Sequence, residues 1–148
     1  MKKIIIGNDH AGYNLKQNVI QALQKHNIID CGCYSNASVD YPDFAKDVAL
    51  KVATDADAIG ILICGTGTGM AIAANKIRGI RAANCYNVEL AQLARQHNDA
   101  NILCLGARFV PNDIAIQIVH CFINTDFEAG RHLNRINKIE NNKYEHQS

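Results

Sequence analysis

Residues 59–69, Ile-Gly-Ile-Leu-Ile-Cys-Gly-Thr-Gly-Thr-Gly, decide the fold of this chain. The apolar half is typical of a strand that is buried on both faces, and the glycine-rich half of a tight loop that enters a helix, expected over 70–75. The backbone N–H groups of such a loop converge at the helix N-terminus, where a negative charge is stabilised. Cys64 lies at the lip of this loop, so its thiol could transfer a proton while the loop holds the resulting charge.

Strand and helix signals alternate along the rest of the chain. Apolar runs predict strands over 3–7, 28–31, 58–64, 80–85 and 102–105. Apolar spacing and prolines near helix starts predict helices over 13–26, 42–53, 70–75, 88–96, 111–123 and 128–140. This alternation indicates the α/β class, a doubly wound parallel sheet of about five strands with helices on both faces, plus a C-terminal helix. Ligands of such sheets bind beyond the carboxyl ends of the strands, so the loops that start at Asn8, Gly65 and Gly106 are expected to face one crevice.

Composition narrows the functional class. The 148 residues suit one domain over 1–148, with 141–148 as a frayed tail. The net charge of +1 argues against nucleic acid or an anionic membrane as a partner. No apolar run approaches the ~18 residues of a spanning helix, and no signal peptide is evident, so we expect a cytoplasmic protein. The six cysteines form no CxxC pair, and Cys85, Cys104 and Cys121 lie in apolar runs that favour core packing.

The glycine loop does not match three familiar anion-binding motifs. A dinucleotide fingerprint requires a glycine at the position of Met70. A cysteine phosphatase loop requires an arginine at the same position. The Gly-Lys-Ser/Thr end of a P-loop is absent from the sequence. A small anion or a developing oxyanion is therefore favoured over a nucleotide, with a purely structural strand-to-helix turn as the alternative.

Six motifs together resemble one enzyme family. They are Asn8-Asp9-His10-Ala11-Gly12, Asp40-Tyr41-Pro42-Asp43, Cys64-Gly65-Thr66-Gly67-Thr68-Gly69, Ala74-Asn75-Lys76, Gly79-Ile80-Arg81-Ala82 and Arg95-Gln96-His97-Asn98-Asp99. In this order, the motifs resemble those of the type B ribose-5-phosphate isomerases, a family shared with the galactose-6-phosphate isomerase subunits. The resemblance extends over residues 3–139. The resemblance implies a Rossmann-like fold, a homodimer or higher oligomer with active sites shared between subunits, a phosphorylated sugar as substrate, and neither a metal nor another cofactor.

The resemblance also implies roles for individual residues. Cys64 matches the base that removes the carbon-bound proton, Thr66 the group that shuttles the hydroxyl proton, and His97 the residue that opens the sugar ring. The substrate-binding positions are Asp9, His10, Tyr41, Gly65, Gly67, Thr68, Gly69, Asn98, Arg108, Arg131 and Arg135. The implied reaction is an aldose–ketose isomerisation through a cis-enediolate, with D-ribose 5-phosphate and D-ribulose 5-phosphate as the leading substrate pair of the pentose phosphate pathway.

Simpler interpretations exist for several of these residues. His97 could cap a helix C-terminus, Asp9 a helix N-terminus, and Arg131 with Arg135 could be a solvated charge pair. Allose or galactose 6-phosphate is an alternative substrate, and a non-catalytic sugar-phosphate binding module an alternative function. A metal held by three histidines (His10, His97 and His132) is a further alternative, disfavoured because no carboxylate cluster accompanies them in the sequence.

Overall fold

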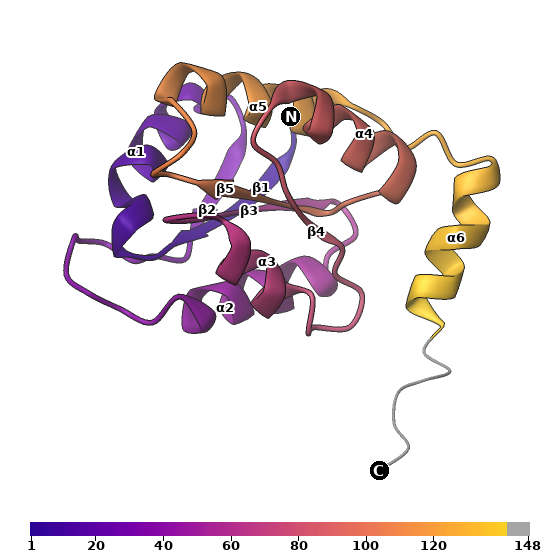
Figure 1. Ribbon diagram of the computed structural model, residues 1–148, viewed down its shortest axis with the longest axis horizontal. Coiled ribbons are helices and arrows are strands. Elements are labelled where there is room, and N and C mark those ends of the chain that lie inside the picture. Colours follow the sequence, from indigo (N-terminus) through magenta and orange to yellow (C-terminus); the bar gives the residue numbers. More distant parts are fainter. Residues whose placement is uncertain (142–148) are drawn as a thin grey trace, which may run out of the picture.

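A single parallel sheet forms the centre of the computed structural model, which describes residues 1–141 (Figure 1). Its strands are β1 (Lys3–Asn8), β2 (Asn27–Asp30), β3 (Ala58–Cys64), β4 (Ala82–Asn84) and β5 (Ile102–Gly106), in the order β2-β1-β3-β5-β4. The sheet confirms the predicted doubly wound α/β class. Of the tail expected over 141–148, residues 142–148 lie outside the described part of the chain. Within 1–141, no helix combines the length and the apolar character that crossing a bilayer demands.

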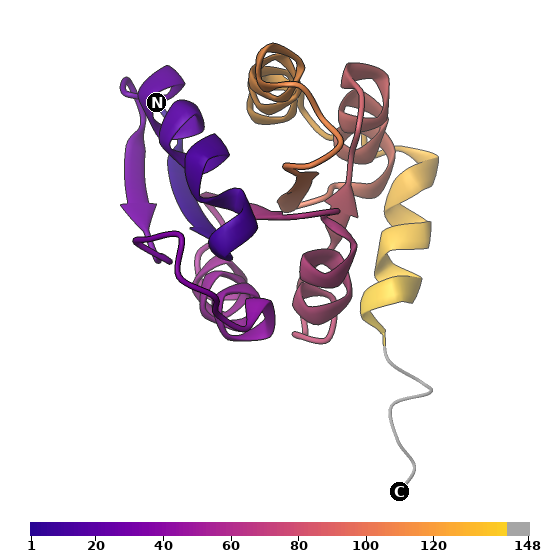
Figure 2. The same ribbon diagram turned by 60° about the vertical axis from the view of Figure 1, so that its left-hand side comes forward.

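Helices cover both faces of the sheet, as Figures 1 and 2 show. They are η1 (His10–Gly12), α1 (Tyr13–Ala22), α2 (Tyr41–Ala53), α3 (Thr68–Ala74), α4 (Val88–Asn98), α5 (Asn112–Asn124) and α6 (Arg131–Glu140). One apolar core lies between the sheet and α1, α4 and α5, with Phe122 fully buried in it. The second core lies between the sheet and α2 and α3, and contains Met70. Every residue of β3 is buried, as expected for the central strand of a sheet covered on both faces.

The largest departures from the predicted boundaries are at the first helix, the fourth strand and the last helix. The first helix ends at Ala22 rather than residue 26, with the chain leaving helical geometry at Leu23. The strand predicted over 80–85 is reduced to Ala82–Asn84, because the N–H of Ile80 bonds in a turn and that of Arg81 bonds the Asn101 side chain. The last helix begins at Arg131 rather than residue 128, after two consecutive residues with positive φ.

The carboxyl ends of the strands bring three loops together. The N–H of Asp9, after β1, bonds the carbonyl of Ile63 at 3.1 Å, and the N–H of Ala107, after β5, bonds the carbonyl of Cys64 at 2.8 Å. We call this side of the sheet the carboxyl edge. The opposite side, where the strands begin, is the amino edge; there Asn101 follows α4 and its carbonyl accepts from the N–H of Gly60.

A buried lysine holds the loop over 31–40 against the carboxyl edge. The side chain of Lys16 has no exposed surface; its Nζ donates to Asp30 Oδ1 at 3.0 Å and to the carbonyl of Cys33 at 2.5 Å. The ring of Tyr34 lies 5.1 Å from the same ammonium. A buried charge requires partners of this kind, so the start of the loop is fixed in place. Farther along, the N–H of Val39 bonds His10 at 3.3 Å.

Candidate active site

The glycine loop wraps around the sulfur of Cys64. This residue ends β3, and its side chain is almost fully buried. The N–H of Gly67 donates to Cys64 Sγ at 3.2 Å. Gly67 has φ +82°, and a Cβ there would overlap the Asn84 side chain, so glycine is required for this approach. The sulfur thus lies against a backbone donor of its own loop, at the N-terminus of α3.

Further N–H groups of the same loop remain available. The first hydrogen bond within α3 runs from the N–H of Ala71 to the carbonyl of Gly67 at 3.1 Å. The N–H of Thr68 instead bonds Thr66 Oγ1 at 3.2 Å. The N–H groups of Gly69 and Met70 therefore lie in the first turn of α3 without an intrahelical partner, and can face a bound anion.

The two threonines of the loop lie on its outer surface. Thr66 and Thr68 are both exposed. Because Thr66 Oγ1 accepts a bond from Thr68, its own hydroxyl proton is free to donate outward. Asn84 supports both, with its Nδ2 donating to the carbonyl of Thr66 at 3.2 Å and to Thr68 Oγ1 at 3.3 Å. Asn84 was not among the predicted site residues; the available signal was a polar residue at the end of a strand on the predicted ligand side.

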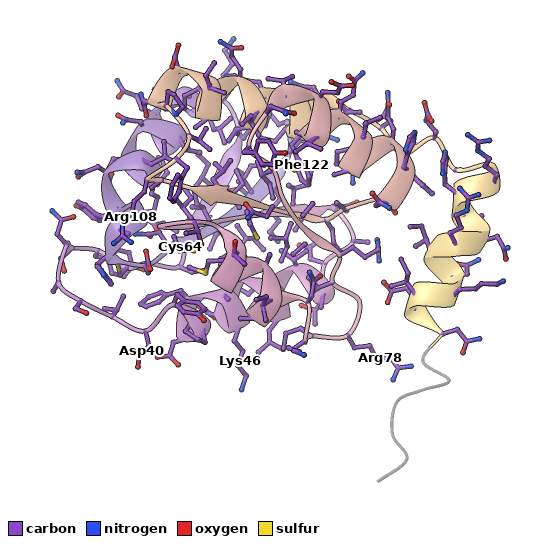
Figure 3. All side chains as sticks on the ribbon, viewed as in Figure 1. Asp40, Lys46, Cys64, Arg78, Arg108 and Phe122 are labelled. Carbon is purple, nitrogen blue, oxygen red and sulfur yellow. The ribbon has the colours of Figure 1, made fainter. Side chains whose placement is uncertain are left out.

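Two larger side chains lie directly over glycines of the loop. A Cβ on Gly65 would lie 2.9 Å from Arg108 Nη1, and a Cβ on Gly69 would lie 2.6 Å from Cε1 of the Tyr41 ring. These glycines therefore provide the space in which Arg108 and Tyr41 approach the loop. Figure 3 shows Arg108 and Cys64 at the same end of the sheet, as predicted. Arg108 is exposed, so its guanidinium remains accessible to an anion.

The pair after β1 also lies at the carboxyl edge. Asp9 Oδ1 accepts from the N–H groups of Ala11 at 2.9 Å and Gly12 at 3.2 Å, so Asp9 does cap η1, as the simpler interpretation held. His10 Nδ1 accepts from Val39, which leaves the opposite ring nitrogen, Nε2, to donate. A half-buried imidazole with a free donor fits a phosphate or hydroxyl contact.

His97 lies at the amino edge, in a histidine pair. It is the penultimate residue of α4, and its ring stacks on that of His132 with centroids 4.3 Å apart and planes 17° apart. Glu128 Oε1 lies 3.8 Å from His97 Nε2 and 3.9 Å from His132 Nε2. Burial lowers the pKa of His132, and His97 and two arginines of α6 act in the same direction, against the carboxylate of Glu128. His132 therefore favours its neutral form, whereas the His97 side chain is 40% exposed and open to a ligand.

Helix α6 presents Arg131 and Arg135 to solvent. Both residues are exposed and four positions apart, so they share a helix face, as predicted. No carboxylate within residues 1–141 forms an ion pair with either. Figures 1 and 2 show α6 at the margin of the molecule, apart from the main helix layers. An arginine pair with this freedom fits a phosphate dianion.

One chain does not bring all the predicted residues together. We call Asp9, His10, Tyr41, Cys64, Gly65, Thr66, Gly67, Thr68, Gly69 and Arg108 the carboxyl-edge group, and His97, Asn98, Arg131 and Arg135 the amino-edge group. α4 begins at the carboxyl edge, after β4, and runs toward the amino edge. The chain that follows its last residues meets β3 at Gly60. From there to Cys64, a strand spans about 13 Å. Two cavities, of about 900 and 340 Å³, are lined by neither Cys64 nor its loop.

The histidine trio considered for a metal is divided in the same way. His10 belongs to the carboxyl edge, whereas His97 and His132 lie at the amino edge. A single carboxylate, that of Glu128, lies close to His97 and His132, with ligand atoms of the three residues within 4.8 Å of one another; the prediction was that no cluster of carboxylates accompanies the histidines.

The other predicted core thiols differ from Cys64 in their surroundings. Cys85 and Cys104 are buried, and Cys121 is half-buried with its sulfur near the carbonyl of Val88. Burial raises the pKa of Cys85 to about 11 and that of Cys104 well above its ordinary value. These two thiols stay protonated at neutral pH.

Comparisons with known proteins match this geometry. The sequence model of the family described as Ribose/Galactose Isomerase matches residues 4–139. Ribose-5-phosphate isomerase B of Escherichia coli K12 is 46% identical over 141 residues, covering 94% of this chain and 95% of the relative. The structure of ribose-5-phosphate isomerase B from Clostridium thermocellum has a TM-score of 0.91 at 51% identity, covering 93% of this chain and 95% of that one. That of the Mycoplasma genitalium enzyme with bound ribulose-5-phosphate has a TM-score of 0.92 at 46% identity, covering 97% of each chain. The chain therefore belongs to the ribose/galactose isomerase family of sugar-phosphate isomerases.

Proposed function

We propose that this protein interconverts D-ribose 5-phosphate and D-ribulose 5-phosphate, a step of the pentose phosphate pathway. The observation that carries the proposal is the hydrogen bond from the N–H of Gly67 to Cys64 Sγ, which gives a thiol the environment of a base. Support for the substrate comes from the relatives, one of whose structures holds ribulose-5-phosphate.

In the proposed reaction of the open-chain sugar, Cys64 transfers the carbon-bound proton and the glycine loop stabilises the negative oxygen. The Cys64 thiolate removes the proton from C2 of the aldose, and the electron pair forms the C1–C2 double bond of a cis-enediolate. The N–H groups of Gly69 and Met70 hold the negative oxygen, and the Thr66 hydroxyl carries the proton between the two oxygens. The Cys64 thiol then returns its proton to C1, which gives the ketose. Donors placed at the oxyanion are each worth about 2.7–4 kcal/mol of barrier.

The amino-edge group serves the sugar ring and the phosphate in this proposal. His97 transfers the proton that opens the furanose ring, with Asn98 beside it as a ligand. Arg131 and Arg135 bind the phosphate dianion, together with Arg108 and His10 at the carboxyl edge.

We further propose that each active site is shared between two copies of the chain. The two groups lie at opposite edges of one sheet, so the Cys64 loop of one copy would face His97 and α6 of the other. The exposure of Thr66, Thr68 and Arg108 around Cys64 in a single chain supports this, because proton transfer from carbon requires a site that excludes water. A symmetric dimer places two such sites at its interface, and higher assemblies can be built from it. The cytoplasm is the proposed compartment, in keeping with six unpaired cysteines.

The proposed function is tested by a coupled assay on a panel of sugar phosphates, with and without a chelator. We expect turnover of ribose 5-phosphate in both conditions, and at least about tenfold lower kcat/KM for allose and galactose 6-phosphates. A preference for a six-carbon substrate would move the assignment to hexose phosphates. Binding without turnover of any substrate would show that the protein is a binding module. Loss of activity in chelator would show that the reaction requires a bound metal.

The His97→Asn variant separates ring opening from isomerisation. Ribulose 5-phosphate cannot form a furanose, because the hydroxyl that would close the ring carries the phosphate. We therefore expect the variant to lose at least about tenfold more activity with ribose 5-phosphate than with ribulose 5-phosphate in initial-rate assays. His120→Asn, an exposed substitution on α5, is the control. Equal losses with both sugars would remove His97 from ring opening.

A further inference from the structure

Arg81 lies between the two elements that carry the amino-edge group. Its side chain is only 16% exposed, and Nε donates to the carbonyls of Asn98 and Asp99, each at 3.1 Å. Nη1 donates to Glu140 Oε1 at 2.6 Å, and Nη2 lies 3.4 Å from Asp99 Oδ2. One guanidinium thus contacts the end of α4, immediately after His97, and the far end of α6.

The end of α4 needs such a partner. The last carbonyls of a helix have no intrahelical donor, and a cation there is favourable. Asp99 then leaves the helix with φ +46°, a conformation that few residues adopt without support. Arg95 holds the other side of Asp99, with Nη1 3.1 Å from Asp99 Oδ1 and Nε bonding the carbonyl of Thr125 at 3.0 Å. Because Asp99 follows His97 by two residues, these contacts hold the backbone that carries His97.

Helix α6 is fastened to α4 at both ends by these contacts. At its start, His132 stacks on His97, and the N–H of Glu128 bonds the carbonyl of Gln96 at 3.1 Å. At its end, only Arg81 supplies an ion pair, through Glu140, among the described residues. A cavity of about 900 Å³ adjoins Arg81, Arg95 and Asp99, so these three residues lie outside the apolar core.

We infer that Arg81 is a positioning residue, which holds His97 in place for ring opening and α6 in place for phosphate binding. This inference rests on the proposed isomerase function. It assigns the two halves of the guanidinium to different steps: the bonds to Asn98 and Asp99 to ring opening, and the bond to Glu140 to the placement of Arg131 and Arg135. A displacement of about 1 Å at a reacting group can cost up to 100-fold in rate.

Paired variants test the two halves. Arg81→Gln is expected to lose about tenfold more activity with ribose 5-phosphate than with ribulose 5-phosphate. Glu140→Gln is expected to raise KM severalfold for both sugars without this difference. Lys25→Gln, which removes an exposed cation elsewhere, is the control. The histidine ring signals in NMR spectra give a readout besides activity, and we expect Arg81→Gln to shift those of His97 and His132.

The outcomes distinguish the inference from the proposed function. If the wild-type protein converts neither sugar, the proposed function fails, and the histidine signals alone decide whether Arg81 positions His97. If Arg81→Gln is folded by circular dichroism and loses equal activity with both sugars, or leaves the histidine signals unchanged, the inference is overturned. Should Arg81→Gln fail to fold, Asp99→Asn removes the ion pairs and retains a residue that tolerates positive φ; it must then show the same difference between the sugars, or the inference fails.

Discussion

Replacing Cys64 with alanine should lower kcat by about a thousandfold or more while leaving sugar-phosphate binding nearly intact. Alanine removes the proposed carbon base, and general base catalysis contributes about 10²–10⁴-fold. The proposed phosphate and hydroxyl contacts come from other residues, so calorimetric Kd values should stay within a fewfold of wild type. Exchange of the C2 hydrogen with deuterated water, followed by NMR, should cease as well.

Cys121→Ala is the matched control for this experiment. It removes a half-buried thiol from α5 and should keep kcat within about twofold, since α5 contributes no residue to the proposed site. A Cys64→Ala variant that turns over within tenfold of wild type, with its fold unchanged, would mean that another group removes the proton.

Two inactive variants should restore activity when they form a dimer together. Cys64→Ala damages the carboxyl edge of one chain, and Arg135→Ala the amino edge of the other. In a dimer with shared sites, one of the two sites then receives both intact edges. Heterodimers purified through two different affinity tags should reach about half of the wild-type activity per dimer, measured below saturation.

Pairing two variants of the same edge is the control for this recovery. Cys64→Ala combined with Arg108→Ala leaves a damaged carboxyl edge in both sites, so those heterodimers should stay inactive. If the Cys64→Ala and Arg135→Ala heterodimer is equally inactive, each site must lie within one chain, and α6 would have to move toward the Cys64 loop.

The fold could be predicted because its signals are local and strong. The apolar run of β3, the glycine loop and the alternation of strand and helix patterns each indicate the same architecture. What failed were boundaries set by tertiary contacts. The start of β4 depends on the side chain of Asn101, twenty residues away, which takes the N–H of Arg81. The start of α6 depends on backbone conformations at Ala129 and Gly130 that no periodicity reveals.

The candidate site could be predicted only as a set of residues. The motifs selected Cys64 and His97, and the resemblance gave them roles, but their positions at opposite edges follow from the direction of α4. Glu128, Asn84 and Arg81 were missed as site residues for a related reason. Each has contacts with residues distant in sequence, and a single polar residue in a loop or strand end carries no spacing signal. The roles themselves remain predictions for the variants described above to test.

Lys16 has a consequence for redesigning this enzyme. Its ammonium fixes the chain at Cys33, and the N–H of Val39 is tied to His10, so both ends of the intervening stretch are anchored. Tyr34 packs against the Lys16 ammonium and belongs to the first anchor, whereas residues 35–38 are exposed and lie between the anchors. Insertions within 35–38 should therefore cost little free energy, since loop closure between fixed ends depends weakly on loop length. A library confined to these four positions tests whether this loop sets the size of the sugar accepted, while the Cys64 loop keeps its sequence.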